Sequence, residues 1–392
     1  MNKALLQFEV QEFIRENLEA DLHKLLLKGS PFPGISGRDL AEQIESKRKA
    51  THKLPEISAV PTIYFPNKRQ LEQCSSEACA AYKAGIIRAE TVFDLTGGFG
   101  VDSYYFSRTA AQVVYCETDN ILAGIASHNF EQLGASNIEP HATDGIQWLQ
   151  GTNKKAHLIY LDPSRRTNER KRVFLLSDCT PNVLQHIDLL FEKSPLILIK
   201  TSPLLDLQAG LRELGSVREI HVVALQNEVK ELLWLMEKGY HGMVTVKTVN
   251  LRGLATQEFS FDPEAEKSQP LQVAGPKAYL YEPNAALMKS GGFKTLGNRL
   301  GIPKLHEHTQ LYTSEDIVDF PGRSFRILGI LPYSGKALKV WNGKKANVTT
   351  RNFPASVAAL RKRFKISDGG DRYLFFTKGP ANDLFVIECE KI

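Results

Sequence analysis

A glycine-rich segment, DLTGGFG at residues 94–100, opens the part of the chain whose residue types could do chemistry. It ends the apolar run TVFD, so it is expected where a buried strand gives way to a helix. Glycines at such a turn let the backbone approach a ligand closely, and the N-terminus of the next helix favours negative charge. A dinucleotide fingerprint would need a third glycine after Gly98 and Gly100, but Ser103 stands in that position. The segment therefore predicts a ligand site and disfavours a nicotinamide cofactor.

Three further acids follow at the ends of the next apolar runs. Glu117 ends VVYCE, where an acid can hydrogen-bond both hydroxyls of a ribose. Asp144, in HATDG, is placed to meet an adenine amino group, and Asp162 ends LIYLD. Any one of these acids could instead cap the helix that follows it. The ordered set, together with Asp94, predicts a ligand crevice at the carboxyl ends of a parallel sheet.

The elements that must position these acids are short apolar strands separated by helix-like stretches. After the first strand come AQVVYCETD, NIEPHATD, HLIYLDPS, SPLILIKTS and REIHVVALQ. GMVTVKTVNL and TQEFSFDP are expected to form a late hairpin at the sheet edge. Because apolar strands that alternate with helices indicate βαβ units, we predict an α/β fold with a doubly wound, mostly parallel sheet.

Four segments are expected along the chain. Residues 1–88 alternate apolar and charged residues at helical spacing and predict a helical N-terminal module, with Ser36 as an N-cap. The parallel sheet is expected at 89–272, and the polar, proline-punctuated stretch 262–276 is a linker candidate. The remainder, 273–392, has the pattern of a small α+β unit.

These motifs resemble those of a known family. DLTGGFG, Glu117, HATDG and LDPSRR are similar to the successive motifs of class I S-adenosylmethionine-dependent methyltransferases, over about residues 71–250. LEQCSSEACAAYKA, YEPNAALMKSGGFK and ISDGGDRYLFF extend the resemblance over nearly the whole chain, to bacterial methyltransferases with a THUMP-like C-terminal domain. The resemblance implies a Rossmann-like sheet of seven strands at 89–272, a small ferredoxin-like segment at 273–323 and a THUMP-like domain at 324–392.

The resemblance also implies S-adenosylmethionine as the cofactor. Glu117 would hold its ribose and Asp144 its adenine. Gln73 would help to hold the methionine carboxylate, or else it belongs to a polar helix start that Glu72 and Ser75 cap. The family's first motif usually has a glycine where Thr96 stands, a substitution also found in RNA-modifying members. The full set of implied cofactor-binding residues is Asp94, Thr96, Gly98, Gly100, Glu117, Asp144, Gly145 and Gln73.

The segment DPSRR resembles the D/N-P-P-Y motif of methyltransferases that act on exocyclic amino groups. In this comparison Asp162 and Pro163 would be the catalytic residues that orient the acceptor. Ser164 and Arg165 depart from the motif's second proline and its aromatic residue, so methyl transfer in general is better supported than amino-group methylation. Arg165 and Arg166 could hold RNA phosphates, or could pair with acids of their own loop. Two later segments could line the pocket, KTSP at 200–203 and the start of NEVKELLWL at 227–235.

The charge of the chain is unevenly distributed. The total of +5 divides into +2 over residues 1–88, −6 over 89–272 and +9 over 273–392. No acid interrupts the basic residues between 336 and 365, and Trp341 and Phe353 lie among them. Basic residues with interleaved aromatics fit a nucleic-acid groove, although a solvated helix face would have the same charges. The RNA-binding residues that we expect here are Lys344, Lys345, Arg361, Lys362 and Arg363.

Composition excludes several other classes of protein. The chain of 392 residues is 42% hydrophobic and 24% charged, as in ordinary globular proteins. Its five cysteines are dispersed and form no CxxC pair, so we expect no disulfide framework, no required metal and a cytoplasmic location. We expect no signal peptide, because the N-terminal stretch MNKALLQFEVQEFIRENLEADL carries Glu and Arg among its apolar residues. We expect no membrane partner, because no apolar run approaches about 20 residues.

The function that we predict is methylation of a base in structured RNA, in tRNA or rRNA, by an enzyme that uses S-adenosylmethionine. Two alternatives remain open. The chain could be a non-catalytic RNA-binding protein that senses the cofactor, or a methyltransferase for a small molecule or a protein.

Overall fold

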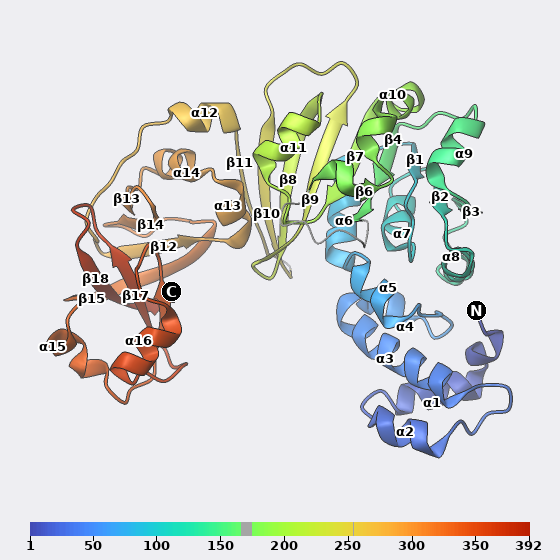
Figure 1. Ribbon diagram of the computed structural model, residues 1–392, viewed down its shortest axis with the longest axis horizontal. Coiled ribbons are helices and arrows are strands. Elements are labelled where there is room, and N and C mark those ends of the chain that lie inside the picture. Colours follow the sequence, from blue (N-terminus) through green and yellow to red (C-terminus); the bar gives the residue numbers. More distant parts are fainter. Residues whose placement is uncertain (166–174, 254) are drawn as a thin grey trace. The chain divides into compact units, whose positions relative to one another are not determined.

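The computed structural model describes residues 1–165, 175–253 and 255–392. The chain forms two compact units (Figure 1). Unit 1 comprises Met1–Arg218 and Leu232–Gly242, and unit 2 comprises Glu219–Glu231 and Met243–Ile392. Strands β8 (Val217–Leu225) and β9 (Glu228–Glu237) each run from one unit into the other.

Unit 1 begins with the predicted helical module. Ser36 caps α3 as predicted, in a capping box with Asp39. The helices pack around a small apolar core that includes Leu5, Val10 and Leu40. The elements are η1 (Lys3–Leu6), α1 (Phe8–Glu16), α2 (Leu22–Lys28), α3 (Gly37–Lys53), α4 (Pro55–Ala59), α5 (Lys68–Gln73) and α6 (Glu77–Ile86).

Two amide side chains hold the end of this module that leads to the rest of unit 1. Gln43 of α3 binds both the N–H and the carbonyl of Phe65 within the module, and Asn129 of α8 (Asn120–Gln132) binds both backbone groups of Tyr64. Gln43 and Asn129 are 4% and 3% exposed. The ring of Phe65 in turn lies against that of Phe99, in the glycine-rich segment. The module therefore supports the loop that carries the predicted ligand site.

The sheet of unit 1 contains the predicted parallel strands. Within the described residues of this unit, six strands follow the order β9-β7-β4-β1-β2-β3, and only β9 is antiparallel to its neighbour. The count of seven strands implied by the resemblance is thus not confirmed for this unit. The strands besides β9 are β1 (Thr91–Asp94), β2 (Gln112–Glu117), β3 (Ile138–Ala142), β4 (Leu158–Leu161) and β7 (Leu196–Thr201).

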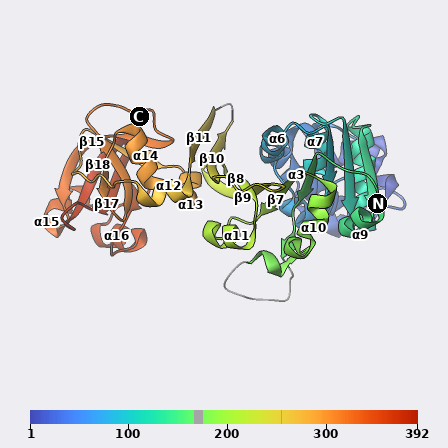
Figure 2. The same ribbon diagram turned by 90° about the horizontal axis from the view of Figure 1, so that it is seen from above.

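Helices cover both faces of this sheet. Figure 2 shows α6 and α7 on one face of the strands and α9 and α10 on the other. A two-stranded pair, β5 (Ser164–Arg165) with β6 (Cys179–Thr180), and the turn η2 (Leu176–Asp178) follow β4. The helices are α7 (Val101–Ser107), α8 (Asn120–Gln132), α9 (Gly145–Gly151), α10 (Val183–Lys193) and α11 (Leu207–Glu213).

Unit 2 contains the predicted late hairpin. Strands β10 (Thr245–Arg252) and β11 (Ala255–Phe261) pair antiparallel, and β10 also pairs parallel with β8. The linker candidate at 262–276 contains a short helix, α12 (Pro263–Ser268), that Asp262 caps. Its Glu266 accepts the first free N–H groups of α14, so this stretch is more ordered than its composition predicted.

The rest of unit 2 is a mixed sheet of order β13-β14-β12-β15-β18-β17-β16. Glu282 of β12 is 3% exposed and pairs with both Arg323 and Arg351, which ties three parts of this sheet together. The strands are β12 (Tyr279–Pro283), β13 (Lys304–His306), β14 (Thr309–Ser314), β15 (Gly322–Pro332), β16 (Asn347–Thr350), β17 (Arg372–Lys378) and β18 (Leu384–Lys391). The helices are α13 (Ala285–Ser290), α14 (Phe293–Leu300), α15 (Gly335–Leu338), η3 (Lys339–Trp341) and α16 (Val357–Phe364).

Candidate functional site

The glycine-rich loop is held from below by Asp94, the last residue of β1. Asp94 is 0% exposed, and its two carboxylate oxygens accept hydrogen bonds from the Thr96 N–H at 3.1 Å and the Ser103 hydroxyl at 2.6 Å. Burial raises the pKa of Asp94 to about 7, against the lowering effect of the Ser103 hydrogen bond. Asp94 therefore shapes the loop from within.

Three glycines of this loop occupy positions that a side chain would disturb. A Cβ at Gly97 would lie 2.1 Å from the ring of Tyr115, and one at Gly100 would lie 2.6 Å from Phe130. Gly98 and Gly100 have positive φ angles of 55° and 86°. The Tyr115 hydroxyl donates to the Gly98 carbonyl at 2.6 Å, which fixes the loop over β2. The close approach to Tyr115 of β2 explains the glycine at 97. The Phe130 ring and a positive φ explain the glycine at 100, and a positive φ alone favours the glycine at 98.

Glu117 ends β2 directly beside the loop. Its Oε2 accepts the Gly98 N–H at 2.9 Å, and its Oε1 accepts the Asp119 N–H at 2.8 Å. The side chain is half-buried at the carboxyl end of the sheet. A carboxylate held in this way offers fixed oxygens to a ligand that lies on the loop.

Asp144 and Gly145 lie at the start of α9, after β3. Asp144 caps this helix by accepting the Gln147 N–H at 2.9 Å. This is the alternative role expected for any single acid at a strand end. A Cβ at Gly145 would lie 2.3 Å from the Leu95 carbonyl oxygen. The missing side chain therefore lets α9 approach the loop after β1, which places the Asp144 cap near the glycine-rich segment.

Asp162 follows β4 and is tied to the same loop. Its N–H donates to the Thr96 hydroxyl at 2.6 Å, so the residue that replaces the usual first glycine links the two motifs. Its carboxylate forms an ion pair with Lys200, at the end of the neighbouring strand β7. Pro163 is buried. The structure therefore gathers Thr96, Asp162 and Lys200 at one edge of the sheet.

A buried charged cluster lies beneath this edge. Lys83 of α6 pairs with Asp102 of α7 at 3.2 Å, and their side chains are 0% and 10% exposed. Ser75 and Tyr160 donate to the Asp102 carboxylate at 2.8 and 2.9 Å. Although burial by itself raises the pKa of Asp102, the charges of Lys83 and Lys200 and these two hydrogen bonds hold it below its usual value. This cluster was not predicted from the sequence; its signal is Lys83 within the alanine-rich helix EACAAYKAGI.

Two other residues expected at the site lie in α5 and in the turn between β8 and β9. Gln73 is exposed at the end of α5, two residues before Ser75. Within unit 2, Asn227 accepts the N–H of Ala285, the first residue of α13, at 2.8 Å. Arg165 belongs to β5, and Arg166 lies outside the described residues.

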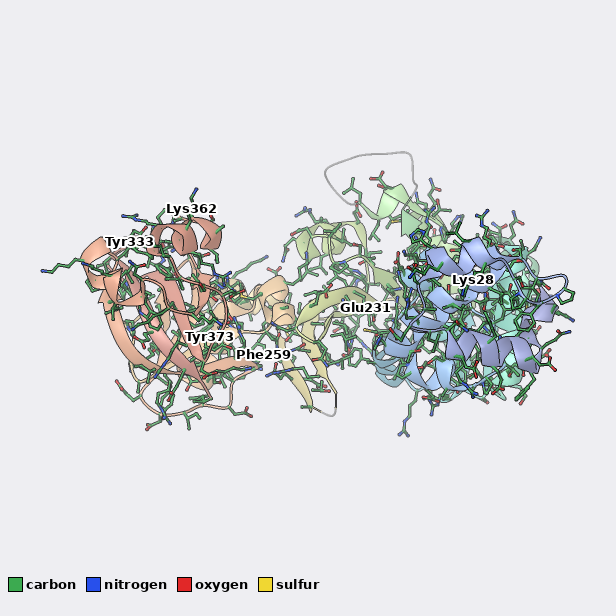
Figure 3. The ribbon with its side chains drawn as sticks, turned by 90° about the horizontal axis from the view of Figure 1, so that it is seen from below. Lys28, Glu231, Phe259, Tyr333, Lys362 and Tyr373 are labelled. Atoms are coloured by element: carbon green, nitrogen blue, oxygen red, sulfur yellow. The ribbon has the colours of Figure 1, made fainter. Side chains whose placement is uncertain are left out.

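The expected RNA-binding residues lie in the part of unit 2 that contains η3 and α16. Lys344 and Lys345 are exposed in the loop before β16, which hydrogen-bonds to the segment after α16. Figure 3 shows Lys362 on the outer side of α16. Arg361 pairs with Asp368, and Arg363 lies over the Tyr333 ring. Both arginines therefore have contacts of their own.

The aromatic residues of this end have a different role from the one expected. Trp341 is 6% exposed and belongs to the hydrophobic core with Leu360 and Phe364. Phe353 packs edge-on against Tyr333 and Phe376. Trp341 is therefore not one of the exposed aromatics that a nucleic-acid groove would need, because its ring fills the core beneath the basic loop.

Among the described residues, no group of three or more His, Cys, Asp or Glu side chains could hold a metal ion. No helix in the described parts of the chain has the length and apolar character required to cross a membrane.

Comparison with known proteins bears on the whole chain. A ferredoxin-like domain family matches residues 279–321, and a THUMP domain-like family matches residues 322–391. The crystal structure of a "putative methyltransferase" from Porphyromonas gingivalis W83 is 32% identical in sequence, with a TM-score of 0.89. That match covers 100% of this chain and 98% of the other.

Two other solved structures are similar over a smaller part. A "putative methyltransferase yhhF" from Escherichia coli is 18% identical, with a TM-score of 0.30 over 44% of this chain and 88% of that one. A "putative methyltransferase" from Streptococcus mutans in complex with SAH is 13% identical, with a TM-score of 0.31 over 41% of this chain and 96% of that one. No curated protein matches the sequence.

Proposed function

Because the chain belongs to the family of methyltransferases that carry a THUMP-like C-terminal domain, we propose that it transfers a methyl group from S-adenosylmethionine to a base in structured RNA, either tRNA or rRNA. The observation that carries this proposal is the meeting of the glycine-rich loop, Glu117 and Asp162 at the carboxyl edge of one parallel sheet. We keep the domain boundaries expected from the sequence: 1–88, 89–272, 273–323 and 324–392.

The residues at this edge fit the cofactor. A Cβ at Gly98 would meet only the Thr96 carbonyl oxygen, at 4.0 Å, so there is open space over the loop backbone. Glu117 presents its carboxylate beside this space, as required for the two hydroxyls of a ribose. When bound, S-adenosylmethionine supplies a methyl group activated by a sulfonium. Asp144, near the next strand end, is then placed for the adenine.

Asp162 and Pro163 have the task of holding the acceptor. The Thr96 hydroxyl fixes the Asp162 backbone to the cofactor loop, so the acceptor and the cofactor are positioned by one connected segment. Such positioning speeds the reaction, because the entropy lost in bringing the two reactants together is lost on binding and not in the methyl-transfer step. Arg165 and Arg166 follow Ser164 in the sequence, and we propose that they contact RNA phosphates.

Replacing Glu117 with alanine should weaken S-adenosylmethionine binding by about 10- to 100-fold, because the variant loses charged hydrogen bonds worth about 1.5–3 kcal/mol. Isothermal titration calorimetry measures this effect directly. Glu131→Ala, an exposed position on α8, is the matched control and should bind as the wild type does. Equal affinities for Glu117→Ala and wild type, or no binding by the wild type, would contradict the proposed cofactor site.

The RNA part of the proposal is supported by the exposed lysines of unit 2. Replacing Lys344 and Lys345 together with alanine should weaken binding of unmodified tRNA and lower the slope of log affinity against log salt by about 2. Lys24 and Lys28 of α2 are also exposed, and Lys28 is labelled in Figure 3; replacing this pair is the control. An equal loss in both double variants would show general charge attraction and would count against a defined RNA surface.

A further inference from the structure

Lys200 places its ammonium against Asp162, the residue proposed to hold the acceptor. Lys200 is on β7 and Asp162 follows β4, and these neighbouring strands pair through Leu161 and Ile199. The Lys200 side chain is 12% exposed, and Asp162 is 33% exposed. A nearly buried ammonium therefore lies next to a carboxylate that still reaches the surface of the site.

This pair presents a hydrogen-bond acceptor beside a donor. The carboxylate of Asp162 accepts, whereas the ammonium of Lys200 only donates. An ammonium has three N–H donors, so one lysine can serve a carboxylate and a substrate oxygen at the same time. The arrangement matches a ligand edge on which an N–H group adjoins a carbonyl.

The charge of Lys200 also distinguishes two kinds of acceptor nitrogen. An exocyclic amino group becomes positively charged as it takes a methyl group, and a neighbouring ammonium opposes that charge. A ring nitrogen of a lactam must instead lose its proton, and negative charge then develops on the adjoining carbonyl oxygen. A preorganised donor stabilises such developing charge strongly. Ser164 and Arg165, which replace the proline and the aromatic residue of amino-group enzymes, agree with the second kind.

On the basis of the proposed function, we propose that Asp162 and Lys200 select a lactam edge, as on guanine or uracil. Asp162 takes the ring N–H proton while Lys200 donates a hydrogen bond to the neighbouring carbonyl oxygen. The ring nitrogen then forms a bond to the methyl carbon, and the carbon–sulfur bond breaks with its electron pair staying on sulfur. S-adenosylhomocysteine leaves, and the proton passes from Asp162 to water.

The test uses the full chain, methyl-labelled S-adenosylmethionine and total RNA from a strain that lacks the gene. Digestion to nucleosides should place the label on a lactam nitrogen, which is N1 of guanosine or N3 of uridine; a label on N7 of guanosine, which has no N–H, would overturn the assignment. Lys200→Met should lower kcat by about 100-fold while the Kd for S-adenosylmethionine stays within about twofold, and its rate should rise further into alkaline pH than that of the wild type. Lys200→Arg, which keeps the charge, should recover much of the rate.

Lys193→Met is the matched control, because the Lys193 side chain is 11% exposed and donates to the Thr152 carbonyl away from the site. A label on an exocyclic amino group or a ribose oxygen would overturn the lactam assignment but leave RNA methylation standing.

A second measurement decides the case in which no RNA is labelled and the proposed function fails. In the presence of S-adenosylhomocysteine, guanosine and uridine monophosphates should bind more tightly than adenosine and cytidine monophosphates, and Lys200→Met should abolish this preference. No preference, or one that Lys200→Met leaves intact, would overturn the inference about Lys200.

Discussion

Replacing Asp102 with alanine is expected to destabilise unit 1 by about 3–5 kcal/mol, the usual cost of removing one partner of a buried ion pair. The variant removes the carboxylate that faces Lys83, whose side chain is 0% exposed. It also removes the acceptor for the Ser75 and Tyr160 hydroxyls. Because Asp102 lies in the first turn of α7, directly after Gly100, the loss should spread to the glycine-rich loop and weaken cofactor binding as well.

Urea unfolding at pH 7 measures this effect, and a double-mutant cycle gives its origin. For the cycle, Asp102→Leu and Lys83→Met should each be strongly destabilising, but the double variant with both substitutions should lose much less than the sum of the two, because neither charge remains buried. Glu139→Ala, which breaks an exposed pair with Lys154, is the control and should cost less than about 1 kcal/mol. Strict additivity of the two single effects would show that the Lys83–Asp102 pair is not the source of the stability.

The stability that Asp102 contributes to unit 1 should depend on pH. The folded pKa of Asp102 lies below its ordinary value, so its stabilising contribution is present above that value and is lost as the pH falls through the folded pKa. Unit 1 should therefore lose this contribution only in strongly acidic solution.

The features that could be predicted from the sequence are local ones. Strand ends and the acids after them follow from short apolar runs, and the glycine-rich turn follows from residues within one βα connection. The helix cap at Ser36 was likewise visible in the sequence, and the structure confirms it. Each of these features depends on a few neighbouring residues and needs no knowledge of strand order.

The features that could not be predicted depend on which strands become neighbours. Lys200 was expected only to line the pocket, because its pairing with Asp162 requires β7 to lie beside β4. Lys83 and Asp102 are brought together by the packing of α6 on α7, which no local pattern records. For the same reason the basic neighbours of Trp341 in the sequence do not show that Leu360 and Phe364 pack against its ring.

Asp94 should make the protein less stable as the pH rises from about 4 to about 7. Burial raises its folded pKa to about 7, from an ordinary value of 3.8. Since the folded state keeps this proton after the unfolded chain has released it, the contribution is fully present below the unfolded pKa and is lost as the pH rises through the folded one. A difference of roughly three pKa units corresponds to about 4 kcal/mol.

Asp94→Asn tests this directly. The asparagine oxygen can accept the Thr96 N–H while its amide donates to Ser103, so the loop contacts survive without a titrating group. Urea unfolding from pH 5 to pH 8 should show a falling stability in the wild type and a flatter profile in the variant, which becomes the more stable of the two at pH 8. Asp206→Asn, an exposed cap of α11 at which asparagine serves as well as aspartate, should keep the wild-type slope. If Asp94→Asn keeps that slope too, Asp94 is already ionised in the folded protein at neutral pH, and the loop is held by a charged carboxylate.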